Sequence, residues 1–377
     1  MRVKRILLLA LAFCTAASSS GCWDATDINN KSLITLVLTA RQDDEFVFYF
    51  EVPNLSVSQS QDSGSSREQY SIVSGAGATF AEARRHLNAK MDKPVFLGTV
   101  RALLVTDELA KHGLEEYMYR MQTMIDYRKT LLIATTRDKP EDVLSVKPEN
   151  NVSIGYSIEE TIRSNRDLGK VVTYTVSDVF EFLYSGYCFV LINLDVREGL
   201  LAYTGYTIIH DGSYLGFIPL EDSAGLVWLL GDNIERIYVV PLGGVLVTFK
   251  VKMKKRDIEP LYADGQITFN ISFSFESEAL YSDKNVSLDD QALEQVKPAL
   301  QAQLLEDIAA AIRQSQSFQC DYLGFKEHFR VAYPNILSQI SKSDWVSRYM
   351  NATFNISAET TLETGMFDFE AQGQSIQ

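Results

Sequence analysis

The change in hydrophobic periodicity near residue 197 constrains the fold of this chain more than any other feature. Between residues 30 and 195, short β-type apolar runs alternate with segments whose apolar residues recur at helical spacing. After residue 200 the chain carries longer β-type runs and then one long helical segment. Alternating strands and helices are typical of α/β layers, so we predict a multi-domain, mixed α/β or α+β protein: an N-terminal α/β domain, then a β-rich domain with a long amphipathic helix.

The N-terminal half is expected to alternate strands and helices. Its Ser/Gln-rich stretch at 56–69 has almost nothing to bury and predicts a mobile loop. The glycines of Gly75-Ala76-Gly77 predict a tight turn that leads into a helix. The predicted strands are 33–38, 46–52, 95–105, 130–135 and 189–194, and the predicted helices are 80–90, 107–112, 115–127, one that opens at 139–142, 158–165 and 176–184.

The C-terminal half is expected to consist of longer elements. Asp211-Gly212 lies between two β-type runs, which predicts a hairpin, and 266–277 alternates as a half-buried strand does. A helix is predicted from about residue 288 to 314, with a final strand at 352–360. The apolar face of that helix comprises Leu293, Val296, Leu300, Leu304, Ile308 and Ile312. The patterns divide the chain into 1–21, 22–196 and 197–377, with 255–265 as a point where the last part could divide again.

The first 22 residues carry a targeting signal. Basic residues within positions 2–5 precede an apolar run at 6–17, and small residues then lead to Cys22, a pattern typical of a secretory signal peptide. Ser19-Ser20-Gly21-Cys22 also resembles the lipobox of bacterial lipoproteins, although a lipobox usually has leucine where this chain has Ser19. The resemblance implies cleavage after Gly21 and a diacylglyceryl group on Cys22. An ordinary signal peptide with a chance cysteine is the alternative.

A lipid on Cys22 would decide where the chain resides. Each buried methylene contributes about 0.8 kcal/mol, so two acyl chains anchor a protein stably where one does not. No later apolar run reaches the ~18–20 residues of a spanning helix, so we expect the mature chain on the outer face of a membrane, tethered at Cys22. The net charge of −14 argues against nucleic acid as a partner, because that binding depends on Lys and Arg neutralising phosphates.

Two cysteines remain for the folded body, Cys188 and Cys320, because Cys14 lies in the leader and Cys22 is the predicted lipidation site. Both have apolar or aromatic neighbours in the sequence, which favours two separate buried thiols. An extracytoplasmic location permits disulfides, so a Cys188–Cys320 bond is the alternative.

The sequence indicates no catalytic, cofactor or metal site. A nucleophile elbow, G-x-S-x-G, and a phosphate-binding G-K-[ST] are both absent. Adjacent acids such as Glu159-Glu160 point to different faces and are expected at a solvated surface. We therefore expect that the chain is not an enzyme. The histidines are not at metal-binding separations and are expected on the surface or in a hairpin; they are His86, His112, His210 and His328.

A family resemblance extends along most of the chain. Gly21-Cys22-Trp23-Asp24, followed by an Asp-Ile-Asn segment, is similar to the start of the Ger(x)C family of spore germination lipoproteins, the C subunits of germinant receptors. Arg101-Ala102 and the residues after Gly324 depart from the family pattern and indicate a divergent member. Other similar segments are Leu97-Gly98 with the strand and helix to Leu114, the hairpin at 205–216, Gly225–Gly231 around Trp228, Asp321–Phe325, Tyr333-Pro334, Trp345 and Gly365.

The resemblance implies a non-catalytic receptor subunit, with a multi-domain mixed α/β fold, on the outer side of the spore inner membrane. Its partners would be a membrane-embedded A subunit and a transporter-like B subunit that receives the nutrient germinant. Whether the C subunit contacts the germinant is left open. Two other classes remain: an extracytoplasmic solute-binding lipoprotein with a ligand between its domains, and a cell-envelope hydrolase with dispersed residues.

Overall fold

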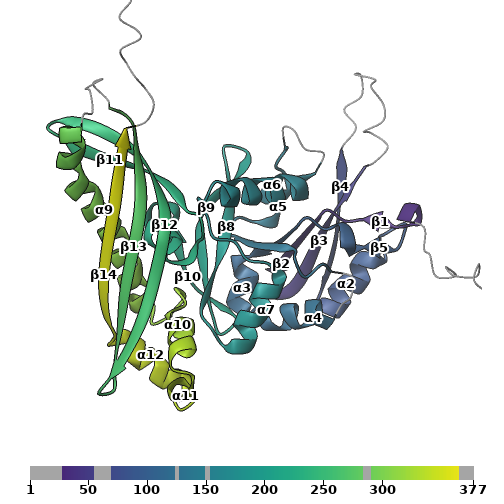
Figure 1. Cartoon of the computed structure of the whole chain (residues 1–377). Coiled ribbons are helices and arrows are strands. Elements are labelled where there is room, and N and C mark those ends of the chain that lie inside the picture. The colour runs from purple at the N-terminus through teal and green to yellow at the C-terminus, as the bar shows by residue number, and fades with distance from the viewer. Residues whose placement is uncertain (1–27, 55–68, 124–126, 149–152, 283–289, 365–377) are drawn as a thin grey trace, which may run out of the picture.

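The computed structural model describes residues 28–54, 69–123, 127–148, 153–282 and 290–364. Cys22 and nearly all of the predicted loop at 56–69 lie outside the described residues. Two sheets with their helices lie side by side (Figure 1). We call the eight-stranded sheet and its helices the α/β body, and everything from residue 224 onward the C-terminal body. The predicted mixed α/β fold with a β-rich second part is confirmed.

The eight-stranded sheet is the centre of the α/β body. Its order is β10-β9-β8-β7-β6-β2-β3-β4. The four central strands pair in parallel, and the flanking strands pair antiparallel. The strands are β2 (Leu36–Gln42), β3 (Glu45–Pro53), β4 (Tyr70–Gly77), β6 (Ala102–Thr106), β7 (Leu132–Thr136), β8 (Phe189–Arg197), β9 (Leu200–His210) and β10 (Ser213–Pro219), and a separate ladder joins β1 (Ser32–Leu33) to β5 (Val95–Phe96).

Helices cover both faces of this sheet (Figure 1). Because both faces are buried, neighbouring residues of a central strand are apolar together: Leu103 and Leu104 are both fully buried and pack into different layers. One layer contains α5 (Pro140–Leu144) and α6 (Ile154–Asp167), and the other contains α2 (Phe80–Asn88), α3 (Asp107–His112), α4 (Glu115–Thr123) and α7 (Val176–Ser185).

Two predictions for the N-terminal half were wrong in detail. Gly75 lies in β4 and not in a tight turn, and a Cβ there would lie 2.4 Å from the Ala83 carbonyl oxygen, so this glycine lets α2 pack closely. The strand predicted at 95–105 is interrupted by a 3₁₀ turn, Leu97–Thr99. The turn is needed because β5 pairs with β1 whereas β6 pairs with β2. The apolar composition of the segment cannot distinguish one strand from two.

The C-terminal body is a four-stranded sheet, β11-β12-β13-β14, crossed by a long helix (Figure 1). The first three strands are antiparallel, and β14 pairs parallel to β13. All six residues predicted for the apolar face of the helix are buried, which confirms that prediction. The elements are α8 (Ala224–Leu230), β11 (Glu235–Leu242), β12 (Val245–Ala263), β13 (Gln266–Ser282), α9 (Asp290–Ser317), α10 (Phe325–Ala332), α11 (Pro334–Leu337), α12 (Lys342–Met350) and β14 (Thr353–Thr364).

One apolar cluster connects the two bodies. It includes Leu104 of β6, Trp228 of α8 and Leu304 of α9, all fully buried. Within the C-terminal body, a Cβ on Gly225 would lie 1.9 Å from the Asp307 carbonyl oxygen, so α8 and α9 cross with their backbones in contact. The eight-stranded sheet also continues past residue 197 through β9 and β10. The division at 197 therefore falls at the β8–β9 turn, and it stays a prediction.

Asp107 is a buried acid at the carboxyl end of β6. It is 7% exposed and accepts a hydrogen bond from Thr207 Oγ1 at 3.3 Å. Burial raises the pKa of this carboxyl to about 6. Because that value exceeds the ordinary one near 3.9, folding favours the protonated acid. Its contribution to stability is fully present below about pH 4 and is lost as pH rises through about 6.

We predict that Asp107→Asn makes stability less dependent on pH. Between about pH 4 and pH 7.5, the wild-type chain should lose about 2 kcal/mol more unfolding free energy than the variant. Urea denaturation across that range measures the difference. Asp222→Asn, at an exposed position, is the control and should follow the wild type; parallel pH profiles for wild type and Asp107→Asn would contradict the assignment.

Candidate functional site

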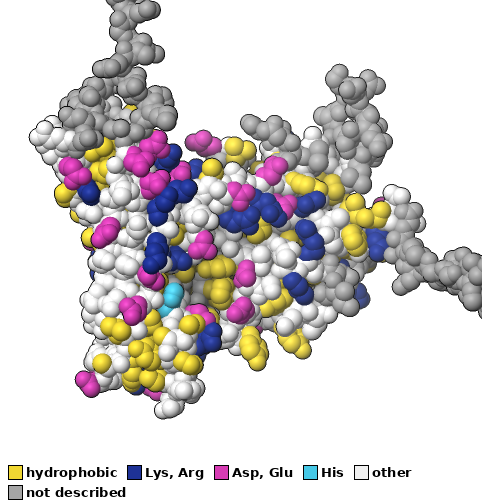
Figure 2. Space-filling view, viewed as in Figure 1, with side chains coloured by type: hydrophobic (Ala, Val, Ile, Leu, Met, Phe, Trp, Pro, Cys, Tyr) yellow, Lys and Arg dark blue, Asp and Glu magenta, His cyan; other side chains and the backbone are white. Residues whose placement is uncertain are grey.

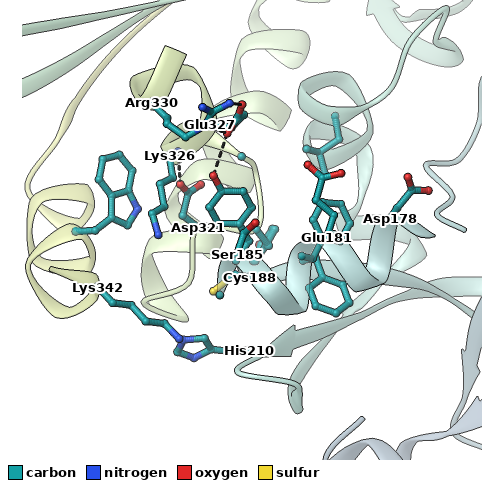
Figure 3. A pocket seen from close by; sticks show the side chains of 18 of the residues that line it. Asp178, Glu181, Ser185, Cys188, His210, Asp321, Lys326, Glu327, Arg330 and Lys342 are labelled. Carbon is teal, nitrogen blue, oxygen red and sulfur yellow. Dashed lines mark hydrogen bonds and ion pairs between the residues drawn. The ribbon is translucent and has the colours of Figure 1, made fainter. Parts of the chain in front are cut away.

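A cavity of about 510 Å³ lies where the α/β body meets α10 and α12 (Figure 3). Asp178 and Glu181 of α7 line one side, and Lys326, Glu327 and Arg330 of α10 line the other. The cavity therefore has carboxylates on one wall and a mixture of cations and carboxylates on the other.

Helix caps fix these walls in place. Thr175 and Asp178 form a capping box at the start of α7: the Thr175 N–H donates to Asp178 Oδ2 at 2.7 Å, and the Asp178 N–H donates back to Thr175 Oγ1. Asp321 caps α10, where its carboxylate accepts from the N–H groups of Phe325 (3.0 Å) and Lys326 (2.6 Å). Caps of this kind satisfy backbone donors that have no partner within the helix.

Charged groups on the α10 side are strongly coupled. The Tyr187 hydroxyl donates to Glu327 Oε2 at 2.9 Å, and Arg330 Nε donates to the same oxygen at 2.6 Å. Burial, together with the bond to Glu327, raises the pKa of Tyr187 to about 12. The Arg330 hydrogen bonds lower the pKa of Glu327. Burial lowers the pKa of Lys326, whose ammonium lies 5.0 Å from the centre of the Tyr187 ring.

The buried acid and indole beside α10 complete this wall. Burial raises the pKa of Asp321 to about 6, opposed by the two backbone N–H groups that it accepts from. Trp345 is 3% exposed, and its indole nitrogen makes no hydrogen bond among the described residues, although it is near enough to lower the Asp321 pKa. The cavity thus offers both donors and acceptors, an arrangement that suits a small polar molecule.

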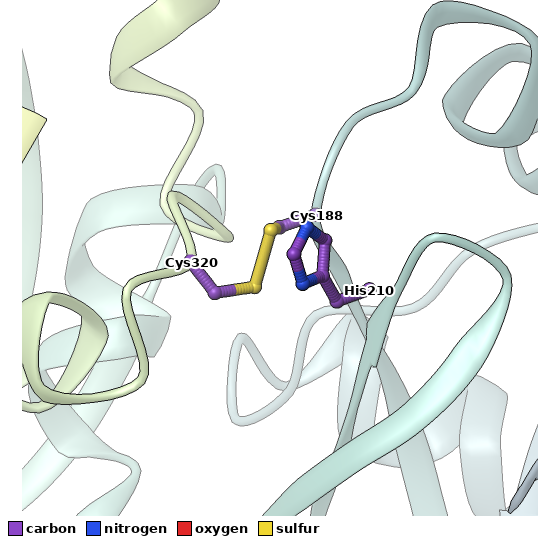
Figure 4. Close-up of side chains that lie close together, drawn as sticks. All are labelled: Cys188, His210 and Cys320. Carbon is purple, nitrogen blue, oxygen red and sulfur yellow. A yellow bond between two sulfur atoms is a disulfide. The ribbon is translucent and has the colours of Figure 1, made fainter. Parts of the chain in front are cut away.

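A disulfide joins Cys188 to Cys320 beside the cavity (Figure 4). The expectation of two separate thiols was wrong. Cys188 precedes β8 and Cys320 follows α9. Docking of the two bodies brings the Cα atoms of these cysteines to 5.8 Å from each other, although 132 residues separate them in the sequence. Local sequence around each cysteine carries no signal of that approach.

His210, at the end of β9, lies beside the disulfide. One ligand atom from each of Cys188, His210 and Cys320 lies within 4.8 Å of the others. Burial, and then the charge of Lys342, lower the pKa of His210. His210 Nε2 is 3.6 Å from Asp211 Oδ2, and Lys342 bonds the other oxygen of that carboxylate. Sequence spacing gave no indication of this grouping.

Glu159, another residue considered from the sequence, does not line the cavity. Glu159 is 8% exposed and pairs with Arg101 and Arg163, so it is buried and not at the solvated surface that we expected. Cys22, the predicted lipidation site, lies outside the described part of the chain.

We predict that the disulfide contributes substantially to stability. Replacing both residues (Cys188→Ser with Cys320→Ser) should lower the unfolding free energy by about 3–5 kcal/mol, because the bond closes a long loop in the unfolded chain. Urea denaturation without reductant measures this. The wild type treated with a dithiol in metal-free buffer is the matched control and should unfold like the variant. Equal stability of the oxidised wild type and the variant would contradict a formed bond.

Family comparisons match both parts of the chain. A model described as spore germination protein N-terminal domain matches residues 24–196, and one described as spore germination B3/GerAC like, C-terminal, matches residues 204–365. Spore germination protein KC of Bacillus subtilis (strain 168) is 20% identical, covering 97% of this chain and 97% of that protein. Spore germination protein A3 of the same organism is 23% identical, covering 72% and 73%.

A solved structure shares the fold. The crystal structure of the GerBC protein aligns with a TM-score of 0.58 at 15% identity, covering 86% of this chain and 96% of that one. The fold of this chain is therefore shared with that crystal structure over most of both chains.

Proposed function

Since this chain belongs to the Ger(x)C family of spore germination proteins, we propose that it is the lipid-anchored, non-catalytic C subunit of a nutrient-germinant receptor. The observation that carries the proposal is the position of the two family matches. The first begins at residue 24, two residues after the lipobox-like Cys22, and the second ends at residue 365. A lipid on Cys22 would therefore leave the whole matched body free to contact other subunits.

The location of the first described residues supports a tethered scaffold. Ile28–Asn30 lie at the end of the α/β body that is farthest from the C-terminal sheet (Figure 1). None of the helices in the described ranges has the length and apolar content needed to cross a bilayer. We infer that the lipid on Cys22 holds the α/β body at the outer face of the spore inner membrane, with the C-terminal body displayed farther from the anchor.

The surface of the C-terminal body supports contacts with protein partners. Hydrophobic side chains gather over the end that carries α10 to α12 (Figure 2). Val331 of α10 is 69% exposed and Leu261 of β12 is 43% exposed. Large exposed apolar groups that lie together are typical of protein interfaces. We infer that this end contacts another protein subunit of the receptor.

We predict that Cys22→Ala releases the chain from the membrane and impairs nutrient germination. The variant should fold normally, because Cys22 lies before the matched body, and it should move from the membrane fraction to the soluble fraction. Fractionation of spores and a germination assay measure the two effects. Cys14→Ala changes a cysteine of the leader and should retain the anchor. Membrane retention of Cys22→Ala at the wild-type level would overturn the proposal.

Solute binding is a second candidate function, favoured by the cavity of about 510 Å³, a size typical of sites for small molecules. A bound solute at a hundredfold excess over its Kd should raise the unfolding free energy by about 2.7 kcal/mol. Thermal denaturation of the purified chain against a panel of small polar metabolites measures this. Trp345→Phe removes the indole N–H and should weaken any such stabilisation. If no compound in the panel stabilises the chain, solute binding is eliminated and the scaffold function remains.

A further inference from the structure

Three chemically reactive side chains converge from distant segments beside the cavity (Figure 4). We propose that Cys188, His210 and Cys320 form a redox-gated zinc site. In the oxidised protein the two sulfurs form the disulfide; after reduction, the two thiolates and the imidazole bind one Zn²⁺. The site is independent of the lipid anchor and goes beyond the receptor role.

The set of donor atoms is the one that zinc prefers. Thiolate sulfur binds Zn²⁺ at about 2.3 Å and imidazole nitrogen at about 2.0–2.1 Å, in a tetrahedron whose ligand atoms lie roughly 3.3–3.8 Å apart. The two sulfurs and the imidazole nitrogen already lie within 4.8 Å of one another. Once the sulfur–sulfur bond is broken, small side-chain rotations are enough to reach that geometry. Cys188 and His210 also line the cavity, so a water molecule can occupy the fourth position.

The backbone holds the three ligands close together. Cys188 immediately precedes β8 and His210 ends β9, and the adjoining residues Phe189 and Ile209 are paired across these two strands. The Ser315 hydroxyl donates to the Cys320 carbonyl oxygen at 2.7 Å and so ties the loop that carries Cys320 to the end of α9. The ligands are thus presented by a sheet and a helix end.

The carboxylate beside the His210 imidazole supports a role for this histidine as a zinc ligand. A histidine that binds zinc commonly directs its other ring nitrogen at a carboxylate, which fixes the orientation of the ring. His210 Nε2 faces the Asp211 carboxylate at 3.6 Å. Nδ1 is therefore the nitrogen that we assign to the metal.

Opening the site requires a two-electron reduction. A dithiol reductant attacks the Cys188–Cys320 bond through a mixed disulfide, is itself oxidised to a disulfide, and leaves two protonated cysteines. Zinc then displaces the two thiol protons into solvent and binds the thiolates. In the oxidised state the disulfide holds β8 beside the loop after α9. In the zinc-bound state the two sulfur–zinc bonds would do the same.

The test uses the full chain with Cys14→Ser and Cys22→Ser, so that the pair supplies the only thiols. The protein is reduced with dithiothreitol, freed of reductant without oxygen, and titrated with Co²⁺, a spectroscopic probe for tetrahedral zinc sites. We expect the reduced protein to take up one Co²⁺ per chain, with sulfur-to-cobalt charge-transfer absorption, and Zn²⁺ to displace it. The oxidised protein should show no such absorption.

His210→Ala distinguishes the assembled site from two thiols that bind metal without it. Loss of this ligand should weaken Co²⁺ binding at least tenfold, whereas His328→Ala, at a half-buried histidine that is not part of this group, should leave it unchanged. Circular dichroism verifies that each reduced protein is folded. Absence of charge-transfer absorption in the reduced chain would overturn the proposal, and so would equal affinities of wild type and His210→Ala, which would indicate binding by unstructured cysteines.

Discussion

The fold depends on one constraint above others: two sheets of different design share a single apolar core. Leu104, at the centre of the eight-stranded sheet, and Leu304, on the long helix of the second sheet, belong to the same buried cluster. Trp228 of α8 belongs to the same cluster, and Gly225 lets α8 touch the α9 backbone within the C-terminal body. The cavity, the disulfide and the capped helices around them all lie where these two bodies meet, so each depends on the shared core.

The sequence predicted much of the fold because its strongest signals are local. The period of α9, the alternation of β13 and the Asp-Gly hairpin each follow from side chains that face one layer, and all three are present. The break at Leu97–Thr99 was missed because it is decided by which strands β5 and β6 pair with. Helix α12 was not predicted either: its nine residues carry only a short apolar face around Trp345 and Tyr349.

The site could be predicted far less well than the fold. Its residues come from α7, the ends of β8 and β9, and the helices after α9, so no spacing in the chain relates them. The best local signal was the aromatic setting of Cys188 and Cys320, and it favoured the wrong state, because a buried thiol and a half of a buried disulfide have similar neighbours. Only the resemblance to germination proteins pointed to a function, and it did so through the order of many weak motifs.

The parallel pairing of β14 with β13 has a consequence for how the chain reaches its final form. Thr353 pairs with Thr268, across the whole helical segment between them. A chain that emerges in order of synthesis must release residue 364 before this sheet can close. Until then the edge of β13 that faces away from β12 lacks its hydrogen-bonding partner. Closure of this sheet therefore depends on a contact of long sequence separation, which makes the step slow. A chain that lacks β14 would expose the unpaired edge of β13, and exposed strand edges favour aggregation.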